Sequence, residues 1–279
     1  MAPERIYLLA DMHLKPLDAP TEEARRLAVR DNHRLAAFLS HIEGKAAGLV
    51  LLGDTFNFWF ERRSKVVGDY YTALSLFKAA ADNGLDIHHI SGNRDFVIGE
   101  GLAYDSKTRY PGFLRLKRGF TVSRLVDFGI EPHGPRHRFH NAGKTVSCIH
   151  GDSLCTGDKL FMFLRSVLLG RIGRTAMRWG PWSAIDFFIS RQQARTGVRG
   201  CGSRPGEMLD QTAVWREMAM GADLLLCGHI HSHHERIVDV DGRQCRLVAL
   251  PAWLDGWHGY IENGEVVIER FEDENEQPQ

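Results

Sequence analysis

Five short apolar runs in this chain each end in a cluster of polar residues. Each run holds four to six residues rich in Leu, Ile and Val, and Gly, Asp or Asn bounds it. With their polar ends, the segments are 5–13, 47–56, 85–95, 144–152 and 222–231. This pattern predicts buried strands with polar loops at their carboxyl ends.

Helical periodicity lies between some of these runs. Segment 21–43 carries apolar residues at helical spacing after Thr21, a residue that can cap a helix, and segment 70–84 shows the same period up to Gly84. Alternating strands and helices predict an α/β core, in which ligands bind beyond the carboxyl ends of the strands. We therefore expect the five polar clusters to meet in one place.

The chain after Glu235 changes character. Turn signals Asp-Gly at 241–242 and Asn-Gly at 263–264 separate alternating runs, which predicts antiparallel hairpins within a β meander. Segment 136–151 predicts another hairpin. The organisation expected is a core in two parts, 1–152 and 207–268, around a helical insertion at 153–206, followed by an acidic, disordered tail at 269–279.

The insertion at 153–206 is apolar, aromatic and basic at once. It holds many more Arg and Lys than Asp or Glu, and more apolar residues than one core face needs. Two interpretations stay open. The insertion could be a lid with an apolar groove that binds lipid acyl chains and basic residues that contact the membrane surface. Alternatively, it could be a helical hairpin packed on its own core with a solvated basic face.

Composition limits the partners. Lys plus Arg and Asp plus Glu are both 35, so net charge gives no attraction toward nucleic acid. Five cysteines without a CxxC pair predict a reduced, cytoplasmic protein. No apolar run reaches the length of a membrane span, no secretory signal is evident, and no oligomer is indicated.

Histidine is the unusual residue. The 14 histidines cluster as "DMH", "HH", "HGPRHRFHN", "IHGD" and "GHIHSHH". A lone histidine is most often a surface or hydrogen-bonded side chain, but histidine is also a common metal ligand.

Seven side chains at the strand ends form a candidate ligand set. They comprise two carboxylates, one amide oxygen and four imidazoles: Asp11, His13, Asp54, Asn93, His150, His229 and His231. Singly, each motif is weak, since Asp54 could serve a turn and His150 a core. Together they suit two divalent ions that share a bridging carboxylate. Mixed N and O ligands favour Mn²⁺, with Fe or Zn as alternatives, over Ca²⁺. We expect Asp11 and His13 to point the same way on extended chain, as do His229 and His231.

The ordered motifs D-x-H, G-D, G-N-R-D, H-G-D and G-H-x-H resemble those of the calcineurin-like metallophosphoesterases, over residues 6–260 apart from the insertion. "GNRDFVIG" and "HGDSLCTGDK" are similar to segments of UDP-2,3-diacylglucosamine hydrolases of the lipid A pathway. The resemblance implies a four-layer αββα sandwich with a helical lid insertion. It also implies cleavage of a lipid-linked UDP-sugar to UMP and a diacylated sugar phosphate, at the cytoplasmic surface of the inner membrane.

The resemblance also assigns roles. One ion would be held by Asp11, His13, Asp54 and His231, and the other by Asp54, Asn93, His150 and His229. Arg94, in the place where most superfamily members carry histidine, would bind phosphate oxygens and act catalytically with His150 and Asp95, the last by orienting a histidine ligand. Substrate contacts are expected from Asn93, Arg94, Asp158, Arg204 and His229. Asn57 departs from the family, which has an acidic residue there.

Two other functions stay open on the sequence. A metallophosphoesterase could act on a soluble nucleotide or a phosphoprotein, although such an enzyme has little use for the aromatic residues of 153–206. A scaffold of the same fold could have lost catalysis, although the complete ligand set speaks against this.

Overall fold

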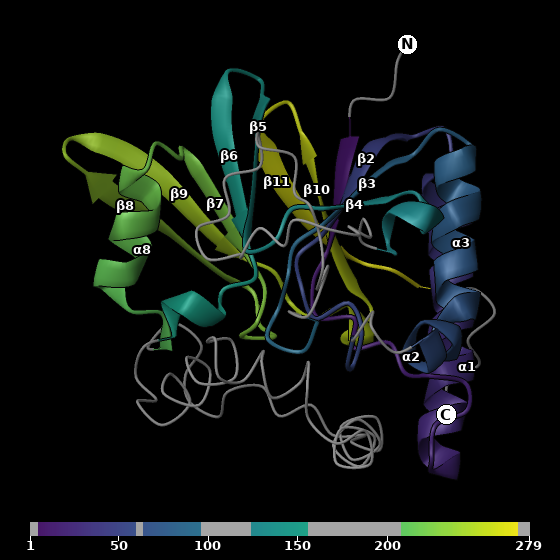
Figure 1. The fold of residues 1–279 in the computed structure, drawn as a ribbon. Helices are drawn as coiled ribbons and strands as arrows, with labels where there is room; N and C mark the ends of the chain where they lie inside the picture. The colour runs from purple at the N-terminus through teal and green to yellow at the C-terminus, as the bar shows by residue number, and fades with distance from the viewer. Residues whose placement is uncertain (1–4, 60–63, 96–123, 156–207, 273–279) are drawn as a thin grey trace, which may run out of the picture.

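Two mixed β-sheets form the centre of the protein (Figure 1). The computed structural model describes residues 5–59, 64–95, 124–155 and 208–272. The six-stranded sheet has the order β11 (Glu265–Arg270), β10 (Trp257–Glu262), β1 (Arg5–Leu9), β2 (Ala46–Leu51), β3 (Asp86–His89), β4 (Ile130–Pro132). The five-stranded sheet has the order β5 (Arg136–Asn141), β6 (Lys144–Ile149), β7 (Leu224–Cys227), β9 (Arg243–Ala249), β8 (His234–Val240).

Each sheet contains a run of parallel strands. In the first sheet β1, β2, β3 and β4 pair in parallel, and in the second β6, β7 and β9 do so. Parallel strands place their carboxyl ends along one edge. The polar clusters that follow five of these strands are therefore brought to the same side of the molecule.

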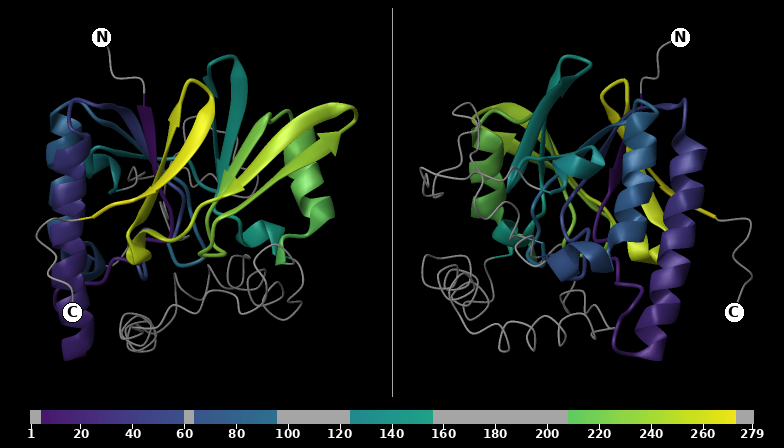
Figure 2. Two further views of the ribbon diagram at one scale, coloured as in Figure 1. Left: turned by 180° about the vertical axis from the view of Figure 1, so that it is seen from behind. Right: turned by 45° about the vertical axis from the view of Figure 1, so that its right-hand side comes forward.

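Helices cover the outer faces of the two sheets, as the turned views show (Figure 2). Helix α1 (Glu22–Ile42) begins at Thr21, whose hydroxyl accepts a hydrogen bond from the backbone N–H of Ala24 at 3.2 Å, as predicted. Helix α3 (Tyr71–Asp82) lies beside it, after the short α2 (Ser64–Asp69). Helix α8 (Gln211–Ala219) covers the other sheet. Three short 3₁₀ turns complete the described elements: Val126–Phe128, Asp152–Leu154 and Trp253–Asp255.

Three apolar layers separate these four layers of structure. One lies between α1, α3 and the six-stranded sheet and includes Phe38 and Phe77. A second fills the space between the sheets and includes Leu8 and Leu226. The third lies between the five-stranded sheet and α8 around Val214. This is the predicted αββα sandwich, and the strands at the five apolar runs and the helices expected within 21–43 and 70–84 are confirmed.

The C-terminal hairpins are confirmed, but the single meander is wrong. Strands β8 and β9 pair across the turn at 241–242 in one sheet, and β10 and β11 pair across the turn at 263–264 in the other. The chain crosses between the sheets after β9, where the backbone N–H of Trp253 donates to the carbonyl of Ala10 at 2.7 Å. Residues 250–253 of this crossing are buried, so tertiary packing decides this step.

The remaining organisational predictions fall largely outside the described residues. Of the insertion predicted at 153–206, the structure describes only residues 153–155, and of the acidic tail predicted at 269–279 only residues 269–272. Strand β11 continues to Arg270, beyond the predicted boundary at 268. None of the helices in the described part of the chain has the length and hydropathy needed to cross a bilayer. Cys148 and Cys227 are fully buried in strands, as expected for packing residues.

Candidate metal centre

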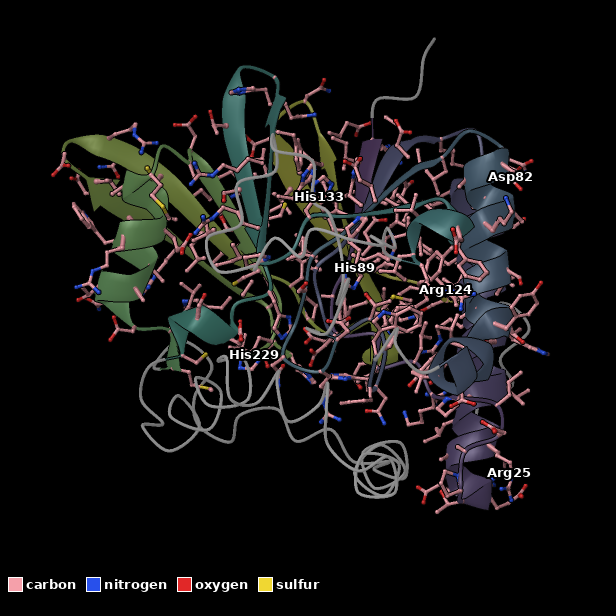
Figure 3. The ribbon with its side chains drawn as sticks, viewed as in Figure 1. Arg25, Asp82, His89, Arg124, His133 and His229 are labelled. Atoms are coloured by element: carbon pink, nitrogen blue, oxygen red, sulfur yellow. The ribbon has the colours of Figure 1, made fainter. Side chains whose placement is uncertain are left out.

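All seven predicted ligands meet beyond the carboxyl ends of β1, β2, β3, β6 and β7. Figure 3 labels one of them, His229, at this end of the sheets. Potential ligand atoms gather in two groups, Asp11 with His13 and His231, and Asp11 with Asp54 and His150. The Asp54 carboxylate lies between the groups, 3.8 Å from Nε2 of His13 and 3.7 Å from Nε2 of His150. The structure thus places two adjoining sites around two buried carboxylates.

The amide of Asn93 and the ring of His229 complete the second group. His150 Nε2 lies 3.0 Å from Oδ1 of Asn93 and 3.2 Å from Nδ1 of His229. The first group is equally close, with 3.3 Å between the Nε2 atoms of His13 and His231. These separations suit ligands that converge on ions.

The backbone conformation of the ligands differs from the prediction. Five of them have left-handed φ angles instead of extended chain: Asp11 (52°), His13 (46°), Asp54 (50°), His229 (69°) and His231 (54°). Such a φ costs an ordinary residue about 1–2 kcal/mol. The expectation that D-x-H and G-H-x-H act through extended geometry was wrong. The chain bends sharply after β1, β2 and β7, and the His13 N–H donates to the Asp54 carbonyl at 2.8 Å.

Two glycines let the ligand loops approach each other closely. A Cβ atom on Gly92 would run into the backbone nitrogen and carboxylate of Asp54. One on Gly228 would run into the carboxylate of Asp11 and the methyl group of Ala10. Gly92 and Gly228 are therefore required because a side chain would clash with the neighbouring loop, and not because of the type of turn.

The buried carboxylates and imidazoles strongly perturb one another. Burial raises the pKa of Asp54 to about 7, against the opposing charge of His150. Burial disfavours protonation of His150, but Asp54 and Asp11 outweigh it and raise its pKa to about 9. Burial lowers the pKa of His229 to about 4. A centre that holds two carboxylates away from water needs compensating positive charge.

Several polar atoms at the centre have the environment of metal ligands. Within the described residues, Oδ1 of Asp11 is buried without a hydrogen-bond partner. The Asn93 amide oxygen faces only acceptors, 3.0 Å from His150 Nε2 and 2.9–3.1 Å from the Asp54 oxygens, an arrangement that a cation among them would stabilise. His150 Nδ1 lies 3.0 Å from the Leu52 carbonyl, to which it can only donate, so Nε2 is the ring nitrogen left to face the centre. The residues present fit divalent ions.

Arg94 stands at the edge of this centre. Its backbone N–H donates to Oδ1 of Asp54 at 2.8 Å, and its Nε lies 3.8 Å from the other oxygen. Its Nη1 donates to Oδ1 of Asn57 at 2.8 Å. The departure at position 57 therefore has a visible consequence, because a neutral amide oxygen holds the guanidinium. This placement keeps the positive charge beside the carboxylate that both ligand groups approach.

Asp95 connects loops instead of orienting a predicted ligand. Its carboxylate accepts from the backbone N–H groups of Gly92 at 2.6 Å and Thr55 at 2.7 Å, and lies 3.0 Å from Nε2 of His89. The histidine it contacts is thus His89, which lies outside the ligand set, so the expected partner was wrong. The second histidine of the "HH" pair, six residues before Asp95, was the signal for this contact.

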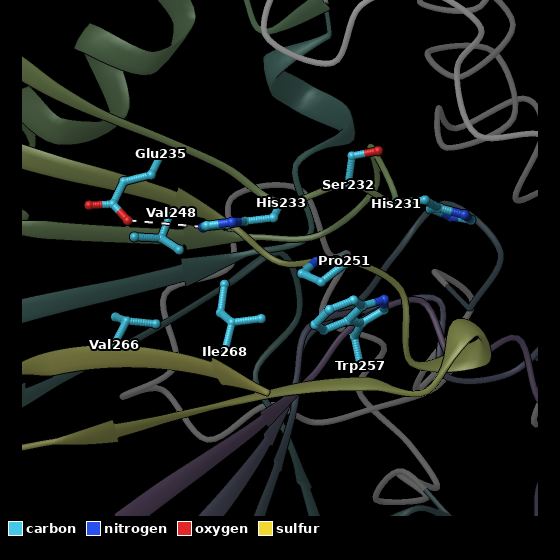
Figure 4. A pocket seen from close by; sticks show the side chains of 9 residues that line it. All are labelled: His231, Ser232, His233, Glu235, Val248, Pro251, Trp257, Val266 and Ile268. Carbon is cyan, nitrogen blue, oxygen red and sulfur yellow. Dashed lines mark ion pairs between the residues drawn. The ribbon is translucent and has the colours of Figure 1, made fainter. Parts of the chain in front are cut away.

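A groove opens beside the first ligand group (Figure 4). It has a volume of about 420 Å³ and extends from His231 to Trp257 and Ile268, between the β8 and β11 edges of the two sheets. His233 and Glu235 form an ion pair at 4.0 Å along it. The predicted substrate contacts Asp158 and Arg204 lie outside the described residues.

The comparisons with known proteins agree with this geometry. The sequence model of the calcineurin-like phosphoesterase family matches residues 4–233. This chain belongs to that family. It is a metal-dependent hydrolase, and its two ligand groups fit a pair of divalent ions.

Two curated relatives of this chain share one name. The chain is 26% identical over 265 residues to a UDP-2,3-diacylglucosamine hydrolase of Pseudomonas paraeruginosa, covering 90% of this chain and 92% of the relative. It is 28% identical to the enzyme of that name from Aeromonas hydrophila, covering 84% and 86%. Among solved structures, a dimetal phosphatase from Danio rerio matches with a TM-score of 0.45 and 13% identity, covering 98% and 100%.

Proposed function

We propose that this protein hydrolyses the diphosphate of UDP-2,3-diacylglucosamine, giving UMP and 2,3-diacylglucosamine 1-phosphate. The observation that carries the proposal is Arg94, which stands beside Asp54 in the position where the wider superfamily carries histidine. The relatives that bear this name, similar along most of their length, support the same substrate.

The seven ligands would hold two ions, with Asp54 shared between them. Asp11, His13, Asp54 and His231 would hold one ion, and Asp54, Asn93, His150 and His229 the other. Bound divalent ions, with Mn²⁺ the proposed pair, lower the pKa of water and neutralise phosphate oxygens. The reaction adds water across the P–O–P bond at the uridine-side phosphorus.

Protein groups position the diphosphate. The planar guanidinium of Arg94 can donate two parallel hydrogen bonds to phosphate oxygens, and Asn57 holds one of its nitrogens. Asn93 and His229 are the proposed further contacts to the substrate, together with Asp158 and Arg204. Asp95 acts through the backbone of the motif loops, since its contacts reach Gly92, Thr55 and His89.

The proposed setting is the cytoplasmic surface of the inner membrane. The apolar and basic segment 153–206 would accommodate the two acyl chains and the anionic lipid surface. The two acyl chains of the proposed substrate and the many Arg and Lys residues of this segment support a location at the membrane surface.

The test is UMP release from UDP-2,3-diacylglucosamine by the purified protein with Mn²⁺, compared with cleavage of a simple nucleotide diester. We expect UMP release by the wild type, near-complete loss with Asp54→Ala and a large loss with Arg94→Ala. Cleavage of the diester alone would instead support a soluble nucleotide substrate. Absence of bound metal, together with no effect of Asp54→Ala, would support a non-catalytic scaffold.

A further inference from the structure

A second histidine cluster lies outside the hydrolytic centre. His88 belongs to β3, His133 follows β4, and His137 belongs to β5. Nδ1 of His88 lies 2.9 Å from Nε2 of His133, and the ring centroids of His133 and His137 are 3.8 Å apart. One potential ligand nitrogen from each ring lies within 4.8 Å of the others. Tetrahedral zinc, with Zn–N bonds of about 2.0–2.1 Å, requires ligand separations of roughly 3.3 Å.

Strand alternation explains why these rings meet. Ile87 and Ile130 belong to the core beneath the helices, so their neighbours His88 and Glu131 face the other sheet. On β5, Phe139 packs against the layer between the sheets, and His137 lies two residues before it on the same face. Strands β4 and β5 are each the edge strand of their sheet. The cluster therefore closes one edge of the layer between the sheets.

We propose that His88, His133 and His137 bind a further divalent transition-metal ion of the zinc class, which ties the edges of the two sheets together. Three imidazoles without a thiolate suit Zn²⁺, Ni²⁺ or Cu²⁺ rather than Mg²⁺ or Ca²⁺. The carboxylate of Glu131 lies 3.5 Å from Nδ1 of His88 and 3.9 Å from Nε2 of His133, within reach of the same ion.

The surroundings of the cluster allow an ion to enter. The side chains of His88 and His133 are 25% and 16% exposed. Burial, together with the charge that neighbouring rings would carry, lowers the pKa of His133 to about 3. Neutral imidazole is the form that binds metal. Figure 3 shows His133 apart from His229, so the two sets of ligands are separate.

The experiment measures zinc per chain in the full-length protein after equilibration with zinc buffered by a competing chelator. The test variants are His137→Asn and His88→Asn. The matched control is His140→Asn, also on β5 but on its opposite face, where the ring contacts the Thr145 hydroxyl at 3.4 Å. We expect both test variants to lose about one zinc ion per chain, or to bind it roughly tenfold more weakly or worse, whereas His140→Asn binds like the wild type.

Thermal unfolding provides the second measurement. An ion that binds only the folded chain stabilises it, so zinc should raise the melting temperature of the wild type more than that of His137→Asn. Both variants should keep the wild-type circular dichroism. Equal zinc content in folded His137→Asn and wild type, with equal melting shifts, would overturn the proposal. Asp54→Asn should lose the ions of the hydrolytic centre but keep the zinc ion at His88, His133 and His137. Metal content therefore tests the two sites independently.

Discussion

The two ends of the sheets use the same backbone conformation for different purposes. At the end away from the metal centre, the turns of three hairpins contain the residue pairs 142–143, 241–242 and 263–264, each with positive φ at both positions. At the metal centre, Asp11, His13, Asp54, His229 and His231 adopt a similar φ.

The difference lies in what holds the conformation. In the hairpins a glycine occupies the second position and the flanking strand pairs close the turn, so local sequence is enough. At the centre, the loops are held by contacts between distant segments, such as the Asp11 carboxylate accepting from the His229 N–H at 2.7 Å. Left-handed residues at the turns reverse the direction of the chain, whereas those at the centre orient the side chains of the ligands.

The largest contrast should come from removing one charge at each end. Asp54→Asn and Asp241→Asn both keep the size of the side chain, and Asn tolerates a left-handed φ. We expect Asp54→Asn to lower kcat/KM by roughly two to three orders of magnitude or more, as for loss of a preorganised charge at a reacting centre. Asp241→Asn should leave hydrolysis unchanged. Steady-state kinetics with metal analysis checks both, and equal activity in the two variants would break the comparison.

Adding a methyl group should separate a crowded glycine from an open one. Gly92→Ala pushes its Cβ into Asp54, so we expect a loss of about 1–3 kcal/mol in the free energy of unfolding, together with loss of activity. Gly68→Ala in α2 has no atom within 4 Å and should be neutral or stabilising by up to about 1 kcal/mol. Denaturant unfolding measures both; a stable, active Gly92→Ala would show that the loops can separate.

The pH dependence of stability should reveal an ion pair far from the centre. Asp223 accepts from the Thr145 N–H and from Arg243, which lowers its pKa below the usual value. A lowered folded-state pKa contributes stability above the unfolded value near 4 that is lost as the pH falls through the folded one. Asp223→Asn should cost about 1 kcal/mol at pH 7, a modest value because solvent screens the pair, and little near pH 2. Urea unfolding at both pH values, with Asp82→Asn as the control, checks this; a pH-independent loss would contradict it.

The smallest effect should come from Ala142 in the β5–β6 turn. The first residues of the other two hairpin turns, Asp241 and Asn263, have polar side chains, but Ala142 does not. At its φ of 46°, Ala142→Gly removes strain and should stabilise the protein by about 0.5 kcal/mol, after the greater chain entropy of unfolded glycine is subtracted. Ala79→Gly, exposed in helix α3, should instead cost about 1 kcal/mol. Opposite signs in thermal unfolding would confirm that conformation, rather than residue type, decides the result.

The residue types of the centre could be predicted because each lies directly after an apolar run. Asp11, Asp54 and His150 were found from strand ends alone, and parallel strands necessarily bring such ends together. The conformation of those residues could not be found this way. Extended geometry for D-x-H was the simple expectation, but the Gly92 and Gly228 approaches that bend the loops are contacts between distant segments.

By itself the sequence determined the strands with polar ends, the two long helices, the C-terminal hairpins, the order of the polar motifs and the type of ligand atoms, because periodicity, turn residues and side-chain chemistry are local properties. It did not reveal α2, α8 or β4. Only the tertiary structure decided that Asp95 contacts His89, that the last two hairpins belong to different sheets, and that His137 meets His88 and His133. The contact of Asp95 depends on how the loop after β3 folds back on that strand. The other two depend on how the two sheets face each other, and that arrangement is set by the apolar layer between them rather than by any one segment.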